Sequence, residues 1–235
     1  MHATDIQRAR AQEHQNALHR RVDAWLDIQQ LYIPGVFALR QRILANTESA
    51  SLPYNIPLLL PSALAGTIGC SPALMELEWR LRYGQAFDAL ADLRGHLEVR
   101  SHLYKFKDRF ARGQRANTRS QAIIKQADAK IDADAARYRA AYSALRALAT
   151  PLCKSGWDEH LVPLHAGDIR HVTEGAEGET EGRRTMSWIW RAAASPPSDT
   201  PGGEGNPLEG SLQECKYISM VSMYTLLNFL RSITR

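Results

Sequence analysis

The sequence predicts an all-α protein: a long antiparallel, coiled-coil-like helical hairpin with an N-terminal helix packed alongside and a disordered C-terminal tail. Two apolar stripes with helical spacing lie within residues 71–149, and a turn-forming segment separates them. A third stripe runs from Leu18 to Tyr32. After Ala194 the chain becomes rich in Pro, Gly and Ser, a composition that is typical of disorder.

The first arm of the hairpin is expected to begin at Ser71 and Pro72, because serine caps helices and proline is tolerated at the first helical position. Gly84 and Gly95 lie inside this arm, where each either permits close approach of a neighbouring helix or marks a bend. Leucines recur along one face of the arm at Leu74, Leu77, Leu81, Leu90, Leu93 and Leu97.

The return arm is expected to begin with a capping box formed by Thr118 and Gln121, after the turn segment 112–117. Its seam has nearly heptad spacing, as in coiled coils. The seam consists of Ile124, Ala127, Ile131, Ala135, Tyr138, Tyr142, Leu145 and Leu148.

The N-terminal helix is expected to run from Asp5 to about Gln30, capped by Thr4 and Gln7 in the same T-x-x-Q pattern. A short helix over residues 36–44 follows the Pro-Gly break. The seam of the N-terminal helix is Leu18, Val22, Trp25, Gln29 and Tyr32.

Three regions follow from these patterns: a helical hairpin domain at 1–150, an irregular segment at 151–191 and the tail at 192–235. Short helical turns are expected at 157–161 and 168–170, followed by an acidic, Gly-rich link at 174–181. Trp188 and Trp190 alternate, which predicts a strand with both rings on one face, packed on the hairpin seam.

Composition excludes several classes of protein. The three widely spaced cysteines do not form a disulfide framework, and the N-terminus has no apolar signal segment. We therefore expect a nuclear or cytoplasmic protein that is not secreted. The apolar run at 217–230 is too short and too polar to span a membrane, so no membrane partner is expected.

No motif predicts catalysis, and we expect that the chain is not an enzyme and uses no cofactor or metal. The spacing of Cys153, His160, His165 and His171 matches no closed zinc pattern. The carboxylates at positions 128, 132 and 134 are interpreted as a solvated acidic face.

The hairpin end is the candidate binding site. Residues 98–125 hold eight basic residues against two acidic ones, a net charge of +6 that favours phosphate-rich partners. If the helix continued through Gly113 the arginines would line one side; if the chain turned there, they would crowd around the turn. Nearby Tyr104, Phe106 and Phe110 are expected in the core. The predicted nucleic-acid contacts are Lys105, Lys107, Arg109, Arg112, Arg115 and Arg119.

Several sequence blocks, in this order, resemble the C-terminal region of Kyakuja–Dileera–Zisupton (KDZ) transposases of the fungal type. The resemblance covers about residues 20–191, and the last two blocks are its most specific parts. The blocks are residues 31–36 (LYIPGV), 60–64 (LPSAL), 80–86 (RLRYGQA), 112–119 (RGQRANTR) and 183–190 (RRTMSWIW).

The resemblance implies a non-catalytic helical module of a DNA transposase, or of its relic. The catalytic core of that family, an RNase-H-like domain with metal-binding carboxylates, lies upstream of the matching region, so no catalytic residue carries over to this chain. Two kinds of partner are implied, the DNA backbone and further copies of the chain. The alternative is a helical protein-interaction scaffold without affinity for nucleic acid.

The tail beyond Gly210 departs from the KDZ pattern, and two interpretations of it are open. Codons TGT-AAG-TAT for residues 215–217 would contain a 5′ splice-site sequence, so the residues from about 215 would be a translated intron in a truncated gene model. The other interpretation is a genuine amphipathic C-terminal helix. We favour the first, because no cap or basic anchor frames the apolar run.

Overall fold

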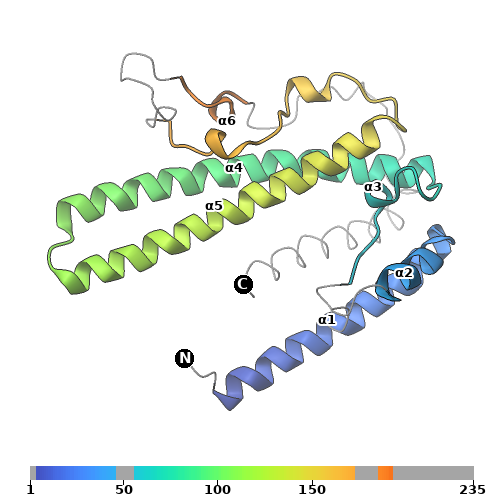
Figure 1. Ribbon diagram of the computed structural model, residues 1–235, viewed down its shortest axis with the longest axis horizontal. Coiled ribbons are helices and arrows are strands. Elements are labelled where there is room, and N and C mark those ends of the chain that lie inside the picture. The colour runs from blue at the N-terminus through green and yellow to red at the C-terminus, as the bar shows by residue number, and fades with distance from the viewer. Residues whose placement is uncertain (1–3, 46–55, 173–184, 193–235) are drawn as a thin grey trace, which may run out of the picture. The chain divides into compact units, whose positions relative to one another are not determined.

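The computed structural model describes residues 4–45, 56–172 and 185–192, and 76% of these residues are helical (Figure 1). No strand is present in this described part, so the predicted all-α class is confirmed. The chain divides into two units inside helix α4 (Pro72–Phe110), between Glu78 and Trp79. The predicted acidic link, the apolar run at 217–230 and the tail from residue 193 lie outside the described residues.

The first unit contains α1 (Asp5–Tyr32), α2 (Val36–Ala45) and α3 (Pro61–Leu64). The predicted capping box at the start of α1 is confirmed, because Gln7 N donates to Thr4 Oγ1 at 3.3 Å and Thr4 N donates to Gln7 Oε1 at 2.9 Å. These two bonds satisfy backbone donors that a helix start otherwise leaves unpaired.

The predicted seam of α1 is buried except at its last member. Tyr32 is 40% exposed, and the next residue, Ile33, is buried instead. The difference arises because α1 ends at Tyr32, so the chain leaves the helical phase at that point. One apolar cluster of this unit joins the seam to the segment before α3 and consists of Leu18, Val22, Trp25, Leu58 and Leu60.

Two buried polar side chains fix the connections within the first unit. Gln29 Nε2 donates to the carbonyl oxygens of Leu58 and Leu59 at 2.8 and 2.7 Å, and its Oε1 accepts from Arg40 on α2. Burial lowers the pKa of Arg40. Gln29 is therefore a hydrogen-bonding anchor within an otherwise apolar seam.

Helices α4 and α5 (Gln114–Ala149) form the predicted hairpin and pack against each other (Figure 1). Every predicted member of the α5 seam is buried except Tyr142, which is half-buried. On α4, Leu90, Leu93 and Leu97 are fully buried, whereas the three earlier leucines are half-buried. The apolar periodicity thus identified the packed face of each arm.

Polar contacts also join the two arms. Asp134 on α5 is only 7% exposed, and its carboxylate meets His96 on α4 at 2.6 Å and Arg137 at 3.1 Å. Arg137 also pairs with Asp92 on α4. The prediction that Asp134 belongs to a solvated acidic face is wrong: its position in the helix repeat turns it toward α4, where His96 hydrogen-bonds its carboxylate, and Arg137 of α5 pairs with the same carboxylate.

The two glycines inside α4 face open space in the described part of the chain. Among the described residues, a Cβ atom added at Gly84 or Gly95 would meet nothing within 4 Å, and α4 continues through both positions. Of the two alternatives that the sequence left open for these glycines, close approach of a neighbouring helix is not found in the part of the chain that the structure describes.

The block around the two tryptophans forms a helical turn, α6 (Trp188–Arg191), where the alternation predicted a strand. The predicted packing on the hairpin is confirmed, since the Trp188 ring lies 5.9 Å from that of Tyr138 on α5. Arg94 on α4 donates to the carbonyl oxygens of Ile189 and Ala192 at 2.6 and 2.7 Å. A helical turn is favoured here because an isolated strand would leave its backbone groups unpaired.

Candidate nucleic-acid interface

The hairpin end is built by a sharp turn between the two long helices. Helix α4 ends at Phe110 and α5 begins at Gln114, so the predicted candidate residues fall on both sides of a three-residue connection. Gly113 has a φ of 82°, a backbone conformation that residues with a Cβ atom rarely adopt. Of the two arrangements left open by the sequence, the chain adopts the turn.

The predicted capping box at the start of the return arm is wrong. Thr118 lies inside α5, and its hydroxyl donates to the carbonyl oxygen of Gln114 at 3.0 Å. The helix begins before Thr118 because Gly113 adopts the conformation that the turn requires. Gln114, Arg115 and Ala116, all good helix formers, follow it. No side chain caps the first turn of α5, and that turn contains no acidic residue.

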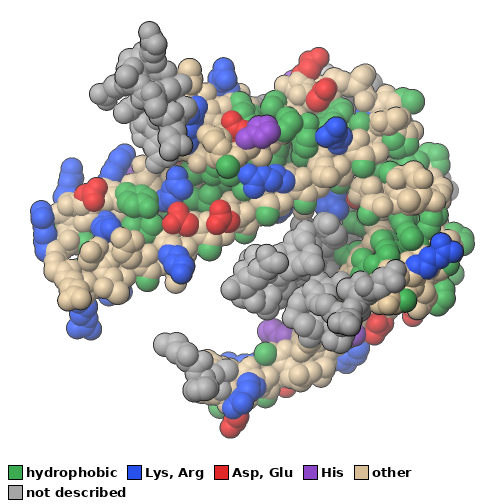
Figure 2. Space-filling model, in the orientation of Figure 1, with side chains coloured by type: hydrophobic (Ala, Val, Ile, Leu, Met, Phe, Trp, Pro, Cys, Tyr) green, Lys and Arg blue, Asp and Glu red, His purple; other side chains and the backbone are tan. Residues whose placement is uncertain are grey.

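The predicted basic side chains gather around this turn, and Figure 2 shows Lys and Arg side chains at that end of the hairpin. Five of the six residues are exposed and Lys107 is half-buried. Lys105, Lys107 and Arg109 come from the last two turns of α4, Arg112 lies in the connection, and Arg115 and Arg119 come from the first two turns of α5.

These six cations are not neutralised by carboxylates in the part of the chain that the structure describes. No ion pair is found there for any of them, whereas Arg100, nearer the middle of the hairpin, lies 3.7 Å from Asp128. Their positive charge is consequently available to a partner, and a chain of phosphates would supply several matching negative charges at once.

The aromatic residues beside the turn are exposed, which overturns the expectation that they belong to the core. Tyr104, Phe106 and Phe110 are 44%, 56% and 60% exposed. The physical reason is that α5 has no buried residue before Ile124, so its first turns provide no apolar cover for this part of α4.

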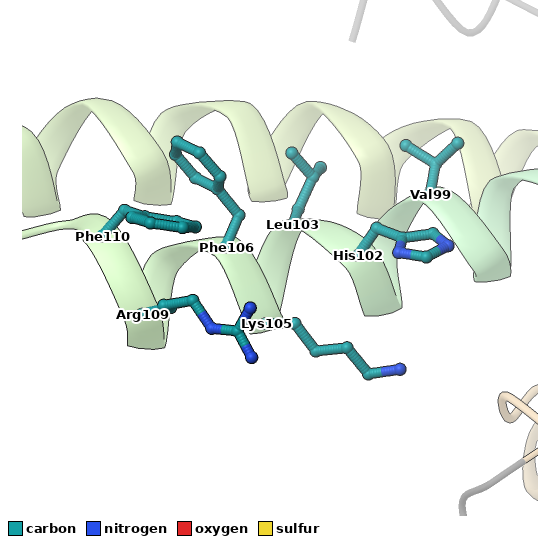
Figure 3. Close-up of a pocket in the computed structure, with 7 residues that line it drawn as sticks. All are labelled: Val99, His102, Leu103, Lys105, Phe106, Arg109 and Phe110. Carbon is teal, nitrogen blue, oxygen red and sulfur yellow. The ribbon is translucent and has the colours of Figure 1, made fainter.

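An open groove of ≈ 600 Å³ runs along α4 past Phe106 and Phe110, and Tyr104 is not among its lining residues. All of its lining residues come from that helix, and Figure 3 shows the side chains of Lys105 and Arg109 on one edge of the row and those of Val99, Leu103 and Phe106 on the other. The Phe106 and Phe110 rings lie side by side, with centroids 5.1 Å apart and planes tilted by 42°. We call Val99, Leu103, Phe106 and Phe110 the apolar stripe.

Sequence reasoning identified the cations but missed the apolar stripe as a surface. The signal was present, since Val99, Leu103, Phe106 and Phe110 recur at helical spacing. Such spacing marks an apolar face without saying whether another helix covers it, and the half-exposed Val99 shows that the face is open along several turns.

Among the described residues, no group of three or more His, Cys, Asp or Glu side chains is arranged to hold a metal ion. The histidines considered as ligands lie in the segment after α5, where His165 begins the turn η3 (Ala166–Asp168) and His171 packs edge-on against Trp190. In the same described part, no helix is both long enough and apolar enough to cross a bilayer.

Comparison with known proteins found no match to this chain among protein-family models, curated proteins or solved structures.

Proposed function

We propose that this chain is a non-catalytic helical module of a KDZ-type DNA transposase, or of its relic, and that the end of its hairpin contacts the DNA backbone. One observation carries the proposal: six basic side chains surround a single turn, and none has an ion-pair partner among the described residues. Backbone contacts of this kind provide affinity without sequence preference.

The location of the KDZ-like sequence blocks supports the proposal. The most basic block, residues 112–119, forms the turn and the first helical turns of α5. Residues 188–190 of the tryptophan block lie in α6, which Arg94 and Tyr138 hold against the hairpin. One block thus supplies the candidate contact surface, while the other packs on the scaffold behind it.

The start of α5 adds a second electrostatic contribution. The first amide groups of a helix carry partial positive charge and attract anions. In α5 no side chain caps these amides, and Arg115 lies within the same turn. A phosphate near the turn would therefore meet both a guanidinium and free backbone donors.

The competing function is a helical protein-interaction scaffold without affinity for nucleic acid. The apolar stripe favours it, because exposed apolar patches often mark protein contacts. The cations around the turn favour DNA. Both functions fit a nuclear or cytoplasmic protein, and self-association is compatible with either.

The test measures binding of the full chain to a labelled 20-base-pair duplex by fluorescence anisotropy at low salt. We expect binding in the micromolar range or weaker, with no dependence on sequence. Changing Arg112, Arg115 and Arg119 together to Gln should weaken it at least tenfold, because three exposed cations are lost from the contact surface.

A control variant removes the same charge elsewhere. Arg10, Arg20 and Arg21 are exposed on α1, where four basic and four acidic residues balance, and changing them to Gln should leave the affinity nearly unchanged. Circular dichroism checks that each variant folds. If duplex binding is absent, or if both triple variants weaken it equally, the proposed contact at the hairpin end is wrong.

A further inference from the structure

We propose that the two phenylalanines of the apolar stripe are a base-stacking platform, so that the hairpin end binds single-stranded nucleic acid more tightly than duplex. The inference rests on the proposed function, because the same basic side chains would hold the phosphates of the strand.

The exposure of the two rings is the first argument. Phe106 and Phe110 are 56% and 60% exposed, and they lie one helical turn apart on the same face of α4. Scattered exposed apolar residues are ordinary on protein surfaces, but Phe106 and Phe110 line one groove together with Leu103 and the half-exposed Val99, which precede them along α4. Part of each ring is therefore available to a flat partner.

The charge beside the rings is the second argument. The Arg109 guanidinium carbon lies 6.0 Å from the centroid of the Phe110 ring, and Lys105 and Arg109 form one edge of the groove (Figure 3). An occupant must then combine apolar, flat groups with negative charge. A strand of nucleotides has both, with bases for the rings and phosphates for the cations.

The same charge disfavours a second copy of the chain as the occupant. A symmetric contact through the stripe would bring Lys105 and Arg109 of one copy close to the same cations of the other, and like charges held together are unfavourable. An acidic amphipathic helix would complement the groove, but it would not account for the cations on the α5 side of the turn.

The accessibility of the base faces determines whether the two rings can bind a single strand or a duplex. In a duplex the faces are stacked on one another at about 3.4 Å and only the base edges reach the grooves. In a single strand the bases can separate and stack on aromatic rings, and this stacking tolerates any sequence. The Phe106 and Phe110 rings, with centroids 5.1 Å apart, contact each other as an aromatic pair, so bases would stack on the solvent-facing sides of the pair.

The test compares an unstructured 20-nucleotide thymidine oligomer with a 20-base-pair duplex, using the full chain and fluorescence anisotropy. The double change Phe106→Leu and Phe110→Leu keeps apolar side chains but removes the aromatic faces. We expect it to weaken binding to the oligomer about tenfold or more and to change duplex binding less than about twofold. The matched control is Phe37→Leu, since Phe37 on α2 is 50% exposed and lies in the other unit.

A second variant reports stacking directly. Phe110→Trp keeps an aromatic ring at the site, and its fluorescence should be quenched by the thymidine oligomer and not by the duplex. Phe37→Trp, the control, should be unaffected by either. Both Phe110 and Phe37 are at least half exposed, so the folded helices tolerate these changes.

Four results would overturn the inference. The stacking role is wrong if the chain binds duplex more tightly than the oligomer, or if the double leucine change does not affect oligomer binding. Either result leaves the proposed backbone contact in place. A chain that binds neither ligand overturns the proposed function together with the inference. A wild-type dimer in light scattering that the double leucine variant converts to monomer, with no effect on oligomer binding, assigns the stripe to a second copy.

Discussion

His96 on α4 and Asp134 on α5 join the middle of the hairpin through an Nδ1–Oδ2 contact of 2.6 Å. The Asp134 side chain is 10% exposed and that of His96 is 30% exposed, so the contact is largely removed from water. Arg137, one helical turn after Asp134, meets the second carboxylate oxygen at 3.1 Å. The carboxylate thus connects the two arms at one register.

Replacing Asp134 with alanine should destabilise the fold by about 2 kcal/mol. Breaking a fully buried pair costs roughly 3–5 kcal/mol, and the partial exposure of His96 reduces that figure. Urea unfolding followed by circular dichroism measures the change. Asp128→Ala is the control, because Asp128 is 43% exposed and 3.7 Å from Arg100, and it should cost less than about 1 kcal/mol. Equal effects would contradict the role of Asp134 as a buried link.

A charge in the α5 seam should unfold the hairpin rather than merely separate subunits. Ile131 is 2% exposed, and Ile131→Asp would place an unpaired carboxylate between the arms, at a cost of several kcal/mol. We expect loss of most helical circular dichroism. Ile123→Asp is the matched control on the same helix, because Ile123 is 41% exposed and should tolerate the change. A folded, fully helical Ile131→Asp monomer in light scattering would show that the seam assignment is wrong.

The sequence was sufficient to predict which faces of the long helices are packed. It was not sufficient to predict which distant residues contact those faces. Ile124, Ile131 and Tyr138 were predicted as buried because burial of one helical face imposes a period that many residues share. Asp134 lies on that same face, but its burial depends on His96, a partner 38 residues away. Sequence periodicity predicts that a carboxylate is exposed because it is polar, and it contains no information about a distant residue that pairs with the carboxylate.

The conformation of short segments and the exposure of apolar surfaces were harder to predict from the sequence. The four residues of α6 are too few to show a helical period, and the turn is held by Arg94, which donates to the carbonyl oxygens of Ile189 and of Ala192, the residue after α6. Phe106 and Phe110 have the spacing of core residues, and only the lack of apolar cover from the start of α5 leaves them exposed. Five of the six candidate cations are exposed and Lys107 is half-buried, as expected for charged side chains, and their contact with nucleic acid stays a prediction.

Replacing either glycine inside α4 with alanine should stabilise the protein by about 0.5–1 kcal/mol. Glycine in a helix interior costs roughly this amount relative to alanine, and the added methyl group at Gly84 or Gly95 meets none of the described residues within 4 Å. Thermal unfolding of each variant measures the gain. Gly113→Ala should have the opposite sign, because alanine is strained at a φ of 82°. A loss of stability at both α4 positions would mean that the glycines accommodate a contact outside the described residues.

The salt dependence of binding separates a backbone contact from a scaffold. Each phosphate neutralised on duplex DNA contributes about −0.9 to the slope of the logarithm of the association constant against the logarithm of salt concentration. Changing Arg112, Arg115 and Arg119 to Gln should therefore flatten the slope for the duplex by roughly two to three units. On a single strand the contribution per phosphate is about −0.7, so the same change should flatten that slope by about two units.

Titrations at several salt concentrations, with the Arg10, Arg20 and Arg21 variant as the charge-matched control, measure these slopes. The control should keep the wild-type slope, because α1 lies in the other unit and its charges balance. An equal slope change in the two triple variants would mean that total charge, and not the hairpin end, determines binding. A scaffold without affinity for nucleic acid would show no binding to either nucleic acid at physiological salt and no response to either set of changes. Its exposed apolar stripe would then bind a protein.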